Sequence, residues 1–450
     1  MIAHRFPRPP SRLDLRIGAA GAIAAAAGVG LLVGRSPALS RLVAAAGLLV
    51  PALALHLLVA ARRGAGGVDS GADVTGMTVI VPANDEVAVV ADLVADLATQ
   101  QPPCRPSDPC VRVVIVDDRS VDGTGDVVRA AISELRSPIP MEALRRSAGR
   151  ATKGAALACV PIDPRPTEIV AVLDADARIS SSFLRDVLGA ARSGIAVGTA
   201  RRRMLLPARG RLARLLAIVQ DDEQTLDGEI QLGRWALGGG SELRGNGMFV
   251  RADILAEVGG WSADALCEDL ELTSRIYLTP DGPRPRWLPG IEVWEQPVLS
   301  LPALVRQRLR WARGAVRRDV QVTLPSLIDR RIPLARRVDA AAYAAQTLAP
   351  FAGLGMLAGG RRGIALIGRL SACYIVGVMA LAAASLRRST NARGGNLRPV
   401  ERGLRAVGVT VFGMAWVAIT PVAWCATVVR PHAVTFERTR HLAGGFCPPG

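Results

Sequence analysis

The chain has 450 residues, of which 50% are hydrophobic, and a formal net charge of +16 at pH 7. It is too long for one ordinary soluble domain and apolar enough for a large core together with membrane segments. Aromatic residues make up only 4% of the chain, and the arginines lie beside apolar segments rather than in one basic tract with stacking residues. This arrangement is typical of cytoplasmic membrane flanks and argues against a nucleic-acid partner.

Cysteine, histidine and lysine are informative by their positions. The seven cysteines show no C-x-x-C spacing, which predicts free thiols in a reducing compartment and neither a disulfide framework nor a zinc site. No histidine lies between Arg62 and Arg430, so catalysis there would use carboxylates, hydroxyls or a metal, and most Ser–His and Cys–His hydrolases are excluded. Lys153 is the only lysine and is either a chance survivor or a point charge needed near a phosphate.

Two apolar runs, residues 17–33 and 42–60, open the chain. Each is close to the ~20 residues that span a hydrocarbon core. A charged start before an apolar run could mimic a secretory signal, but the second run follows at once, so we expect an uncleaved membrane hairpin. Together with a glycine-rich linker at residues 64–71, this hairpin is predicted to form the first unit of the chain, residues 1–70.

The middle of the chain, predicted as one domain over residues 71–300, alternates short β-rich runs with helical patterns. Three strands are expected, at residues 78–82, 111–116 and 169–173. Buried apolar strands that alternate with helices predict a mainly parallel α/β sheet. Ligands of such sheets bind at the carboxyl ends of the strands.

The last third of the chain is again rich in apolar segments. After residue 302, an apolar stripe and an arginine stripe at helical spacing predict an amphipathic helix at the membrane surface, within interface helices at residues 301–335. The remainder, residues 336–450, is predicted to hold membrane helices and a tail, with spans at residues 340–357, 364–386 and 406–429. The arginine-rich loop at residues 387–405 should be cytoplasmic. Two N-terminal and three C-terminal spans then predict a multi-pass protein of the cell membrane, with the α/β domain in the cytoplasm and the C-terminal tail outside.

Asp174 and Asp176 form an Asp-x-Asp pair directly after the strand at residues 169–173. Two carboxylates this close repel each other, and the pair is tolerable when a divalent cation bridges them to a phosphate. Mg²⁺ or Mn²⁺ suits oxygen ligands of this kind. Two acids in a surface turn are the common alternative.

Two further acidic pairs lie at the ends of expected elements. Asp117 and Asp118 end the second strand, where they could accept hydrogen bonds from a uracil or a ribose, or could cap the next helix. Glu268 and Asp269 begin a helical stretch, where acids are ordinarily favourable. Alternatively, Asp269 is a general base that takes a proton from an acceptor hydroxyl.

Gln307, Arg310 and Trp311 have the spacing i, i+3 and i+4, so a helix would present all three on one face. Arg310 could hold diphosphate oxygens there while the indole of Trp311 stacks on a sugar ring. The alternative is an arginine and tryptophan pair that anchors the helix at a membrane surface.

Taken in order, these motifs resemble those of the family 2 glycosyltransferases. The segments that carry the resemblance are VPANDE (81–86), VDDRSVDGT (116–124), KGAAL (153–157), DAD (174–176), ED (268–269) and QRLRW (307–311). They cover residues 77 to about 318, roughly half of the chain. The last motif marks the membrane-embedded branch that includes the cellulose and hyaluronan synthases.

The resemblance implies an α/β GT-A fold, flanked here by transmembrane helices, and transfer with inversion from a UDP-sugar. By matching position, the nucleotide-sugar would be lined by Pro82, Ala83, Glu86, Asp117, Asp118, Lys153 and Asp174. Asp174 and Asp176 would hold Mg²⁺ or Mn²⁺ with the diphosphate. Asp269 would be the base, and the catalytic site would be completed by Glu268, Gln307, Arg310 and Trp311. Asp85 departs from the asparagine that is usual in the family.

A longer stretch narrows the resemblance. The segments ELRGNGMFVR (242–251), GGW (259–261) and EDLEL (268–272) are similar to those of bacterial enzymes that glucosylate diacylglycerol. The resemblance implies that the acceptor lies over a loop and an indole, formed by Arg244, Gly245, Asn246, Gly247 and Trp311. The glycines would permit close approach of the acceptor to the backbone.

The leading hypothesis is metal-assisted transfer of a hexose, glucose, from a UDP-sugar to a membrane lipid such as diacylglycerol. A processive polysaccharide synthase of the cellulose or hyaluronan type shares the last motif, but the predicted spans lack the charged residues that would mark a polymer path. A non-catalytic nucleotide-sugar-binding membrane protein is the third reading, and the intact acidic and QxxRW motifs argue against it.

Overall fold

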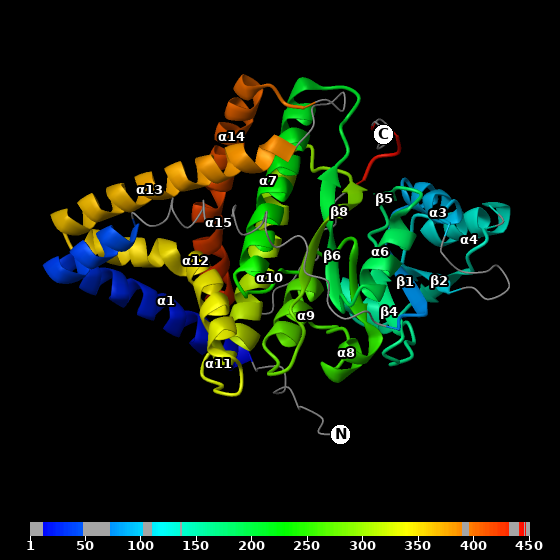
Figure 1. Cartoon of the computed structure of the whole chain (residues 1–450), viewed down its shortest axis with the longest axis horizontal. Coiled ribbons are helices and arrows are strands. Elements are labelled where there is room, and N and C mark those ends of the chain that lie inside the picture. The colour runs from blue at the N-terminus through cyan, green and yellow to red at the C-terminus, as the bar shows by residue number, and fades with distance from the viewer. Residues whose placement is uncertain are drawn as a thin grey trace.

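The computed structural model describes residues 12–47, 73–101, 110–135, 137–388, 396–431, 441–444 and 446. These residues form an α/β domain, a layer of helices beside it, and a group of long apolar helices that project away from the domain (Figure 1). Of the predicted span at residues 42–60, only 42–47 are described, and they are helical. The rest of that span and the glycine-rich linker at residues 64–71 lie outside the described residues.

The α/β domain is built on one eight-stranded sheet of order β3-β2-β1-β4-β7-β6-β8-β5. The strands are β1 (Gly76–Ala83), β2 (Val111–Asp118), β3 (Met141–Arg146), β4 (Glu168–Val172), β5 (Arg178–Ile179), β6 (Val197–Met204), β7 (Met248–Arg251) and β8 (Arg286–Glu295). The half formed by β3, β2, β1 and β4 is parallel, as the near-continuous apolar runs predict. In the other half β7 is antiparallel to both its neighbours, β4 and β6.

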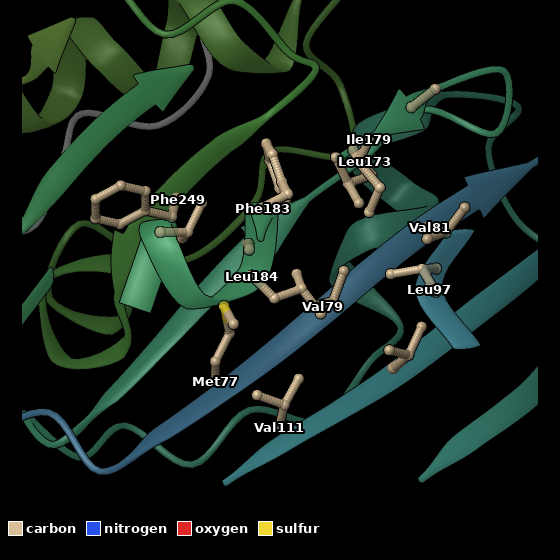
Figure 2. Close-up of a cluster of buried hydrophobic side chains, with 14 of the residues drawn as sticks. Met77, Val79, Val81, Leu97, Val111, Leu173, Ile179, Phe183, Leu184 and Phe249 are labelled. Carbon is tan, nitrogen blue, oxygen red and sulfur yellow. The ribbon is translucent and has the colours of Figure 1, made fainter. Parts of the chain in front are cut away.

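Each face of this sheet carries its own hydrophobic core. On one face, Val79 and Val81 of β1 pack with Leu97 and Phe183 from two covering helices (Figure 2). On the other face, Ile80 of the same strand packs with a second cluster that includes Leu157. The covering helices are α3 (Val90–Ala98), α4 (Thr124–Leu135), α5 (Lys153–Ala158), α6 (Phe183–Arg192), α8 (Ala252–Glu257) and α9 (Glu268–Tyr277). Alternation along a strand between two apolar cores explains why these strands read as uninterrupted hydrophobic runs.

A layer of helices separates this domain from the projecting helices. It consists of α7 (Arg211–Ala236), α10 (Leu301–Arg318), a π-helical turn (Asp319–Thr323), α11 (Leu324–Ser326), α14 (Pro399–Gly413) and α15 (Ala415–Val429). Buried ion pairs join its members: Glu223 of α7 pairs with Arg308 of α10 and accepts a hydrogen bond of 3.1 Å from the indole of Trp416. Asp222 pairs with Arg405 of α14. The helix predicted after residue 302 is thus confirmed as α10.

The projecting helices are α1 (Arg12–Arg35), α12 (Leu334–Ala358) and α13 (Arg361–Ser385). Glycines let α1 and α12 approach closely. A side chain at Gly30 would overlap the carbonyl of Ala352, and one at Gly355 would overlap the carbonyl of Ala27. With Gly34 and Gly359 in contact one turn further, each helix carries the Gly-x-x-x-Gly spacing that favours close packing of membrane helices.

Within the described part of the chain, three stretches are long and apolar enough to cross a membrane: Leu13–Arg35, Arg361–Ser385 and Pro399–Val429. The first two are α1 and α13. The third covers α14 and α15, which run crosswise to α1, α12 and α13 (Figure 1), and Trp424 of α15 is fully buried. The apolar run predicted as a span at residues 406–429 therefore packs between the domain side and the projecting helices, because α10, α1 and α12 all contact α15.

The prediction of free thiols holds for Cys159, Cys267, Cys373 and Cys425. It is wrong for Cys110, which is disulfide-bonded. Pairing of cysteines depends on the distance and direction between their side chains in the fold, and C-x-x-C spacing is not required for it.

Candidate functional site

The candidate site lies at the carboxyl ends of β1, β2 and β4, which meet at one edge of the parallel half of the sheet. Asp118 ends β2, and the Asp174–Asp176 pair follows β4, as the sequence predicts. The start of α9 borders the same space, since Lys153 pairs both with Asp174, just after β4, and with Glu268, the first residue of α9. The site therefore collects side chains that are far apart in the sequence.

The turn after β1 explains the unusual Asp85. Its backbone has a φ of 55°, a left-handed conformation that short polar side chains tolerate best. Its carboxylate accepts a hydrogen bond of 2.7 Å from the backbone N–H of Val121, and the hydroxyl of Ser120 accepts one of 3.0 Å from its own N–H. Aspartate thus holds two turns together here, next to Pro82 and Ala83 at the end of β1.

Asp117 and Asp118 are both buried but have different partners. Asp117 accepts a hydrogen bond of 3.2 Å from the N–H of Ser120 and pairs with Arg145 at 2.6 Å. Asp118 pairs with Arg119 at 2.9 Å and with Arg146. Asp117 therefore fixes the turn before α4, as in the capping interpretation, whereas Asp118 lies at the centre of an arginine cluster beside the strand ends.

Lys153 is the hub of the site. Its ammonium pairs with Asp174 and with Glu268 (3.3 Å), and it donates a hydrogen bond of 3.0 Å to the carbonyl of Gly245. Burial alone would lower the pKa of Lys153, but the two carboxylates raise it above its ordinary value. Likewise, burial raises the pKa of Asp174, but Lys153 more than offsets it and the pKa is lowered. The only lysine of the chain is thus a fixed charge that joins β4, α9 and the loop at Gly245.

Asp176 brings the C-terminal tail into the site. Its carboxylate accepts a hydrogen bond of 3.0 Å from the N–H of Gln296 and lies 3.5 Å from Nε2 of His441. Nδ1 of His441 lies 2.7 Å from the carboxylate of Glu86. Burial raises the pKa of Asp176 to about 6; His441 lowers it, while Glu295 and Asp174 raise it. Although burial lowers the pKa of His441, Asp176 and Glu86 raise it to about 9.

His441 is the main site residue that the sequence analysis missed. The expectation of a site without histidine considered only the stretch between Arg62 and Arg430, and no motif surrounds His441. The prediction that the tail lies on the opposite side of the membrane from the α/β domain is also wrong, because Leu442 forms two hydrogen bonds with Gln296, of 2.9 and 3.0 Å. The crosswise packing of α14 and α15 gives the reason: this run does not carry the chain away from the domain (Figure 1).

Asp269 is the second residue of α9 and has the carboxylate with the electrostatics of a base. Burial and the neighbouring Glu268 raise the pKa of Asp269 to about 7, although Lys153 lowers it. Its carboxylate accepts a hydrogen bond of 2.8 Å from the N–H of Leu270. A side chain at Gly245 would lie 3.1 Å from its carboxylate. The glycine thus lets the loop backbone approach the acid closely.

The loop predicted to lie beneath the acceptor turns its two polar side chains into the protein. Arg244 pairs with Asp227 at 2.7 Å and with Glu242 at 2.7 Å. Asn246 is fully buried and accepts a hydrogen bond of 3.1 Å from the N–H of Asp174. Gly245 and Gly247 have positive φ values of 73° and 71°. The side chains therefore hold the loop, and its backbone at Gly245 faces the carboxylate of Asp269.

On α10, the predicted trio of Gln307, Arg310 and Trp311 is joined by a residue that the sequence analysis did not single out, Arg308. Arg308 is 4% exposed, pairs with Glu223 and places its guanidinium 4.3 Å from the centre of the Trp311 ring. Gln307 accepts a hydrogen bond of 3.2 Å from Arg308. Arg308 thus ties this helix to α7 beneath the indole.

The residues present suit a divalent cation in part. Asp174 and Asp176 offer hard oxygen donors, and the raised pKa of Asp176 marks a buried carboxylate that bound positive charge would stabilise. Among the residues that the structure describes, no three His, Cys, Asp or Glu side chains are arranged so that they could hold a metal ion by themselves. A cation here would thus need oxygen atoms of a bound diphosphate as well.

Comparison with known proteins agrees with this geometry. The model of glycosyltransferase-like family 2 matches residues 75–314, more than half of the chain. A β-monoglucosyldiacylglycerol synthase of Nostoc sp. is 34% identical over 251 residues, which cover 54% of this chain and 49% of the relative. A synthase of the same name from Synechocystis sp. is 32% identical over 254 residues, 53% of this chain and 47% of the relative. This chain thus matches about half the length of each relative.

A solved structure with the same arrangement is the mannosyltransferase of Pyrobaculum calidifontis in complex with GDP-Man and Mn²⁺. It has a TM-score of 0.54 and 17% sequence identity, and the match covers 87% of this chain and 99% of that one. At this identity the likeness concerns the fold alone, and it confirms the expected GT-A architecture. By its sequence match and its fold, this chain belongs to glycosyltransferase-like family 2.

Proposed function

We propose that the enzyme transfers the hexose glucose from a UDP-sugar to the hydroxyl of a membrane lipid such as diacylglycerol. The transfer inverts the configuration at the anomeric carbon. The observation that carries the proposal is Asp269, a buried carboxylate whose pKa is raised to about 7. It lies beside the Gly245 loop. Lys153 interacts with its charge and also pairs with Asp174 of the Asp174–Asp176 pair. The two synthases named above, which act on a lipid by their names, support the choice of acceptor.

In this proposal the donor lies along the strand ends. Pro82, Ala83, Glu86 and Asp118 line the nucleotide, and Asp117 holds the turn that presents them. Asp174 and Asp176 would hold Mg²⁺ or Mn²⁺, which supplies positive charge to the departing diphosphate when bound. Lys153 and Arg310 add fixed positive charge to the same leaving group.

The acceptor then lies over Gly245, with Trp311 at its side. Asp269 accepts the proton of the acceptor hydroxyl while that oxygen forms a bond to the anomeric carbon. The bond from the anomeric carbon to the diphosphate oxygen breaks on the opposite face, which inverts the configuration. Glu268 holds Lys153 in place, and Gln307 holds Arg308 under the indole.

The apolar helices support a multi-pass membrane protein with its catalytic domain in the cytoplasm. Arg16 and Arg313 donate hydrogen bonds of 3.1 and 3.4 Å to the backbone carbonyls of Val429 and Arg430, so cationic side chains lie at the C-terminal end of α15. Such arginines favour the cytoplasmic side of a bilayer. This position would bring the catalytic site to the height of lipid headgroups.

The test is to incubate membranes that contain the protein with UDP-[radiolabelled glucose], Mg²⁺ and diacylglycerol, and to separate the extracted lipids by chromatography. The proposal expects one labelled lipid, which is absent with Asp269→Asn. Label in material too polar to extract would replace the lipid acceptor with a growing polysaccharide. Absence of transfer from each of several UDP-sugars would overturn the proposed donor.

A further inference from the structure

We propose that Glu295, at the end of β8, is a positioning residue that sets the spacing between the Asp174–Asp176 pair and Trp311. The inference rests on the proposed function for its kinetic consequences, but its contacts can be tested without any activity. Glu295 belongs to none of the motifs that define the family resemblance. It is 7% exposed and lies where the sheet, the Gly245 loop and α10 meet.

On one side, Glu295 is linked to the acidic pair. Its Oε2 accepts a hydrogen bond of 3.2 Å from the side-chain amide of Asn246, and the amide oxygen of Asn246 accepts one of 3.1 Å from the N–H of Asp174. The next residue, Gln296, donates its N–H to Asp176 at 3.0 Å. Two consecutive residues of one strand end therefore hold both acids of the pair.

On the other side, Glu295 orients a buried arginine. Arg202 of β6 donates from Nε to Oε2 at 2.9 Å and also pairs through Nη2, and its guanidinium lies 5.5 Å from the centre of the Trp311 ring. Because Arg308 also lies 4.3 Å from the same ring, the indole is placed by two guanidinium groups. Glu295 thus connects the two sets of contacts, because its carboxylate accepts hydrogen bonds from both Asn246 and Arg202.

The charge on Glu295 also restrains Arg202. Arg202 is 8% exposed and close enough to Asp174 and Asp269 to interact with their charges. A buried charge that loses its partner is left uncompensated, which is strongly unfavourable. Without Glu295, we expect the guanidinium of Arg202 to pair with Asp174 or Asp269 instead. That pairing would offset the negative charge that the site needs on these two carboxylates.

A double-variant cycle tests this mechanism. Glu295→Ala is expected to lower kcat about 100-fold, as small displacements of reacting groups do, with the KM for the donor changed about threefold or less. Adding Arg202→Met should leave the enzyme no slower than Glu295→Ala, or faster, because the competing guanidinium is gone. If the double variant is slower than Glu295→Ala by the full factor of Arg202→Met alone, the two residues act independently and the proposal is wrong.

The matched control is Glu292 on the same strand, which pairs with Arg203 at 3.0 Å and with Arg201 at 3.5 Å and has no described contact with Asn246 or the acidic pair. Glu292→Ala should keep kcat within about threefold of the unmodified enzyme. A loss equal to that of Glu295→Ala would show a general effect of removing carboxylates from β8, and would overturn the proposal.

Hydrogen exchange separates this inference from the proposed function. The N–H of Asp174 should exchange faster in Glu295→Ala than in Glu292→Ala or the unmodified protein, because Asn246 loses its anchor. Unchanged exchange of the peptide that contains Asp174 would overturn the positioning role even in an active enzyme. Conversely, if the unmodified protein transfers no sugar, the proposed function fails, and the exchange result still decides the role of Glu295.

Discussion

The active-site edge of the sheet and the joint between the α/β domain and α10 both bury carboxylates, but in opposite electrostatic states. At the joint, Glu242 lies between Arg318 (2.6 Å) and Arg244 (2.7 Å). Burial raises the pKa of Glu242, but Arg318 and Arg244 outweigh it and lower the pKa to about 2. At the edge, burial and Glu268 raise the pKa of Asp269 to about 7. At the joint, a charged acid paired with two arginines holds elements together, whereas at the edge an acid with a raised pKa is suited to take up a proton.

The largest expected effect comes from replacing Asp269, the proposed base, at the edge. Asp269→Asn keeps the shape and the hydrogen bond to the N–H of Leu270 but cannot take a proton, so transfer should fall by about 10³-fold. The measurement is kcat for lipid labelling, with binding of UDP to the purified protein as the control for folding. Residual transfer above a tenth of the unmodified rate would assign the base to another group.

At the joint, removing a carboxylate should affect stability first. Glu242→Ala leaves Arg318 buried next to Asp319 alone, and breaking a buried pair in this way costs about 3–5 kcal/mol. We expect a lower midpoint of thermal unfolding in detergent, measured against Arg129→Ala, which breaks an exposed pair on α4. Equal midpoints for the two variants would mean that the joint adds nothing to stability.

The two regions should also respond differently to pH. Below pH 7 Asp269 is protonated and cannot act as a base, so kcat/KM should fall about tenfold for each pH unit below 7 and level off above it. For a catalytic acid the trend would be the opposite, because kcat/KM would fall as the pH rises above the pKa of the acid. The pH profile of transfer measures this, and a rate that rises as the pH falls from 7 to 5 would contradict it.

The lowered pKa of Glu242 predicts a separate transition. Its ordinary pKa is 4.5, so the charged pair contributes stability above that value, and the contribution is lost as the pH falls from about 4.5 to about 2. Unfolding midpoints of the unmodified protein and Glu242→Gln should therefore converge over this range. A constant difference between them down to pH 2 would contradict the shift.

The smallest effect concerns the distance between the two regions. Gly314 of α10 faces the thiol of Cys267, directly before α9, and a side chain there would overlap the sulfur. Gly314→Ala should push α9 from α10 and lower kcat several-fold, and Cys267→Ala should partly restore it. Unchanged kcat in Gly314→Ala would show that the spacing of these helices tolerates an added methyl group.

The edge of the sheet was largely predictable, because apolar strands end in Asp118 and Asp174 and parallel strands gather their ends. Local pattern also places Asp269 at a helix start. His441 and Glu295 were not predictable, since each reaches the site through packing of distant segments and neither lies in a recognisable motif. The sequence does not show which buried arginine neutralises which acid, so the roles of Arg308 and Arg244 emerge only from the fold.

Hydrophobicity alone does not fix how the apolar run at residues 406–429 is arranged. The run at residues 406–429 is as apolar as a membrane span, but length and composition do not tell whether such a run crosses a bilayer or lies against other helices. In the fold, Trp424 donates a hydrogen bond of 3.2 Å to Thr347 of α12, and Trp416 reaches Glu223. These contacts hold the run crosswise, and they involve partners that no local pattern identifies.

The glycine contact between α1 and α12 has a consequence for synthesis. α12 begins roughly 300 residues after α1 ends, and a ribosome adding about 5–20 residues per second needs roughly 15–60 s to make that stretch. During this interval all eight strands of the α/β domain are made, while the face of α1 at Gly30 and Gly34 still lacks its contacts with α12. The pair of α1 and α12 is therefore begun before the α/β domain and completed after it, and α1 is open to contact with other helices until α12 arrives.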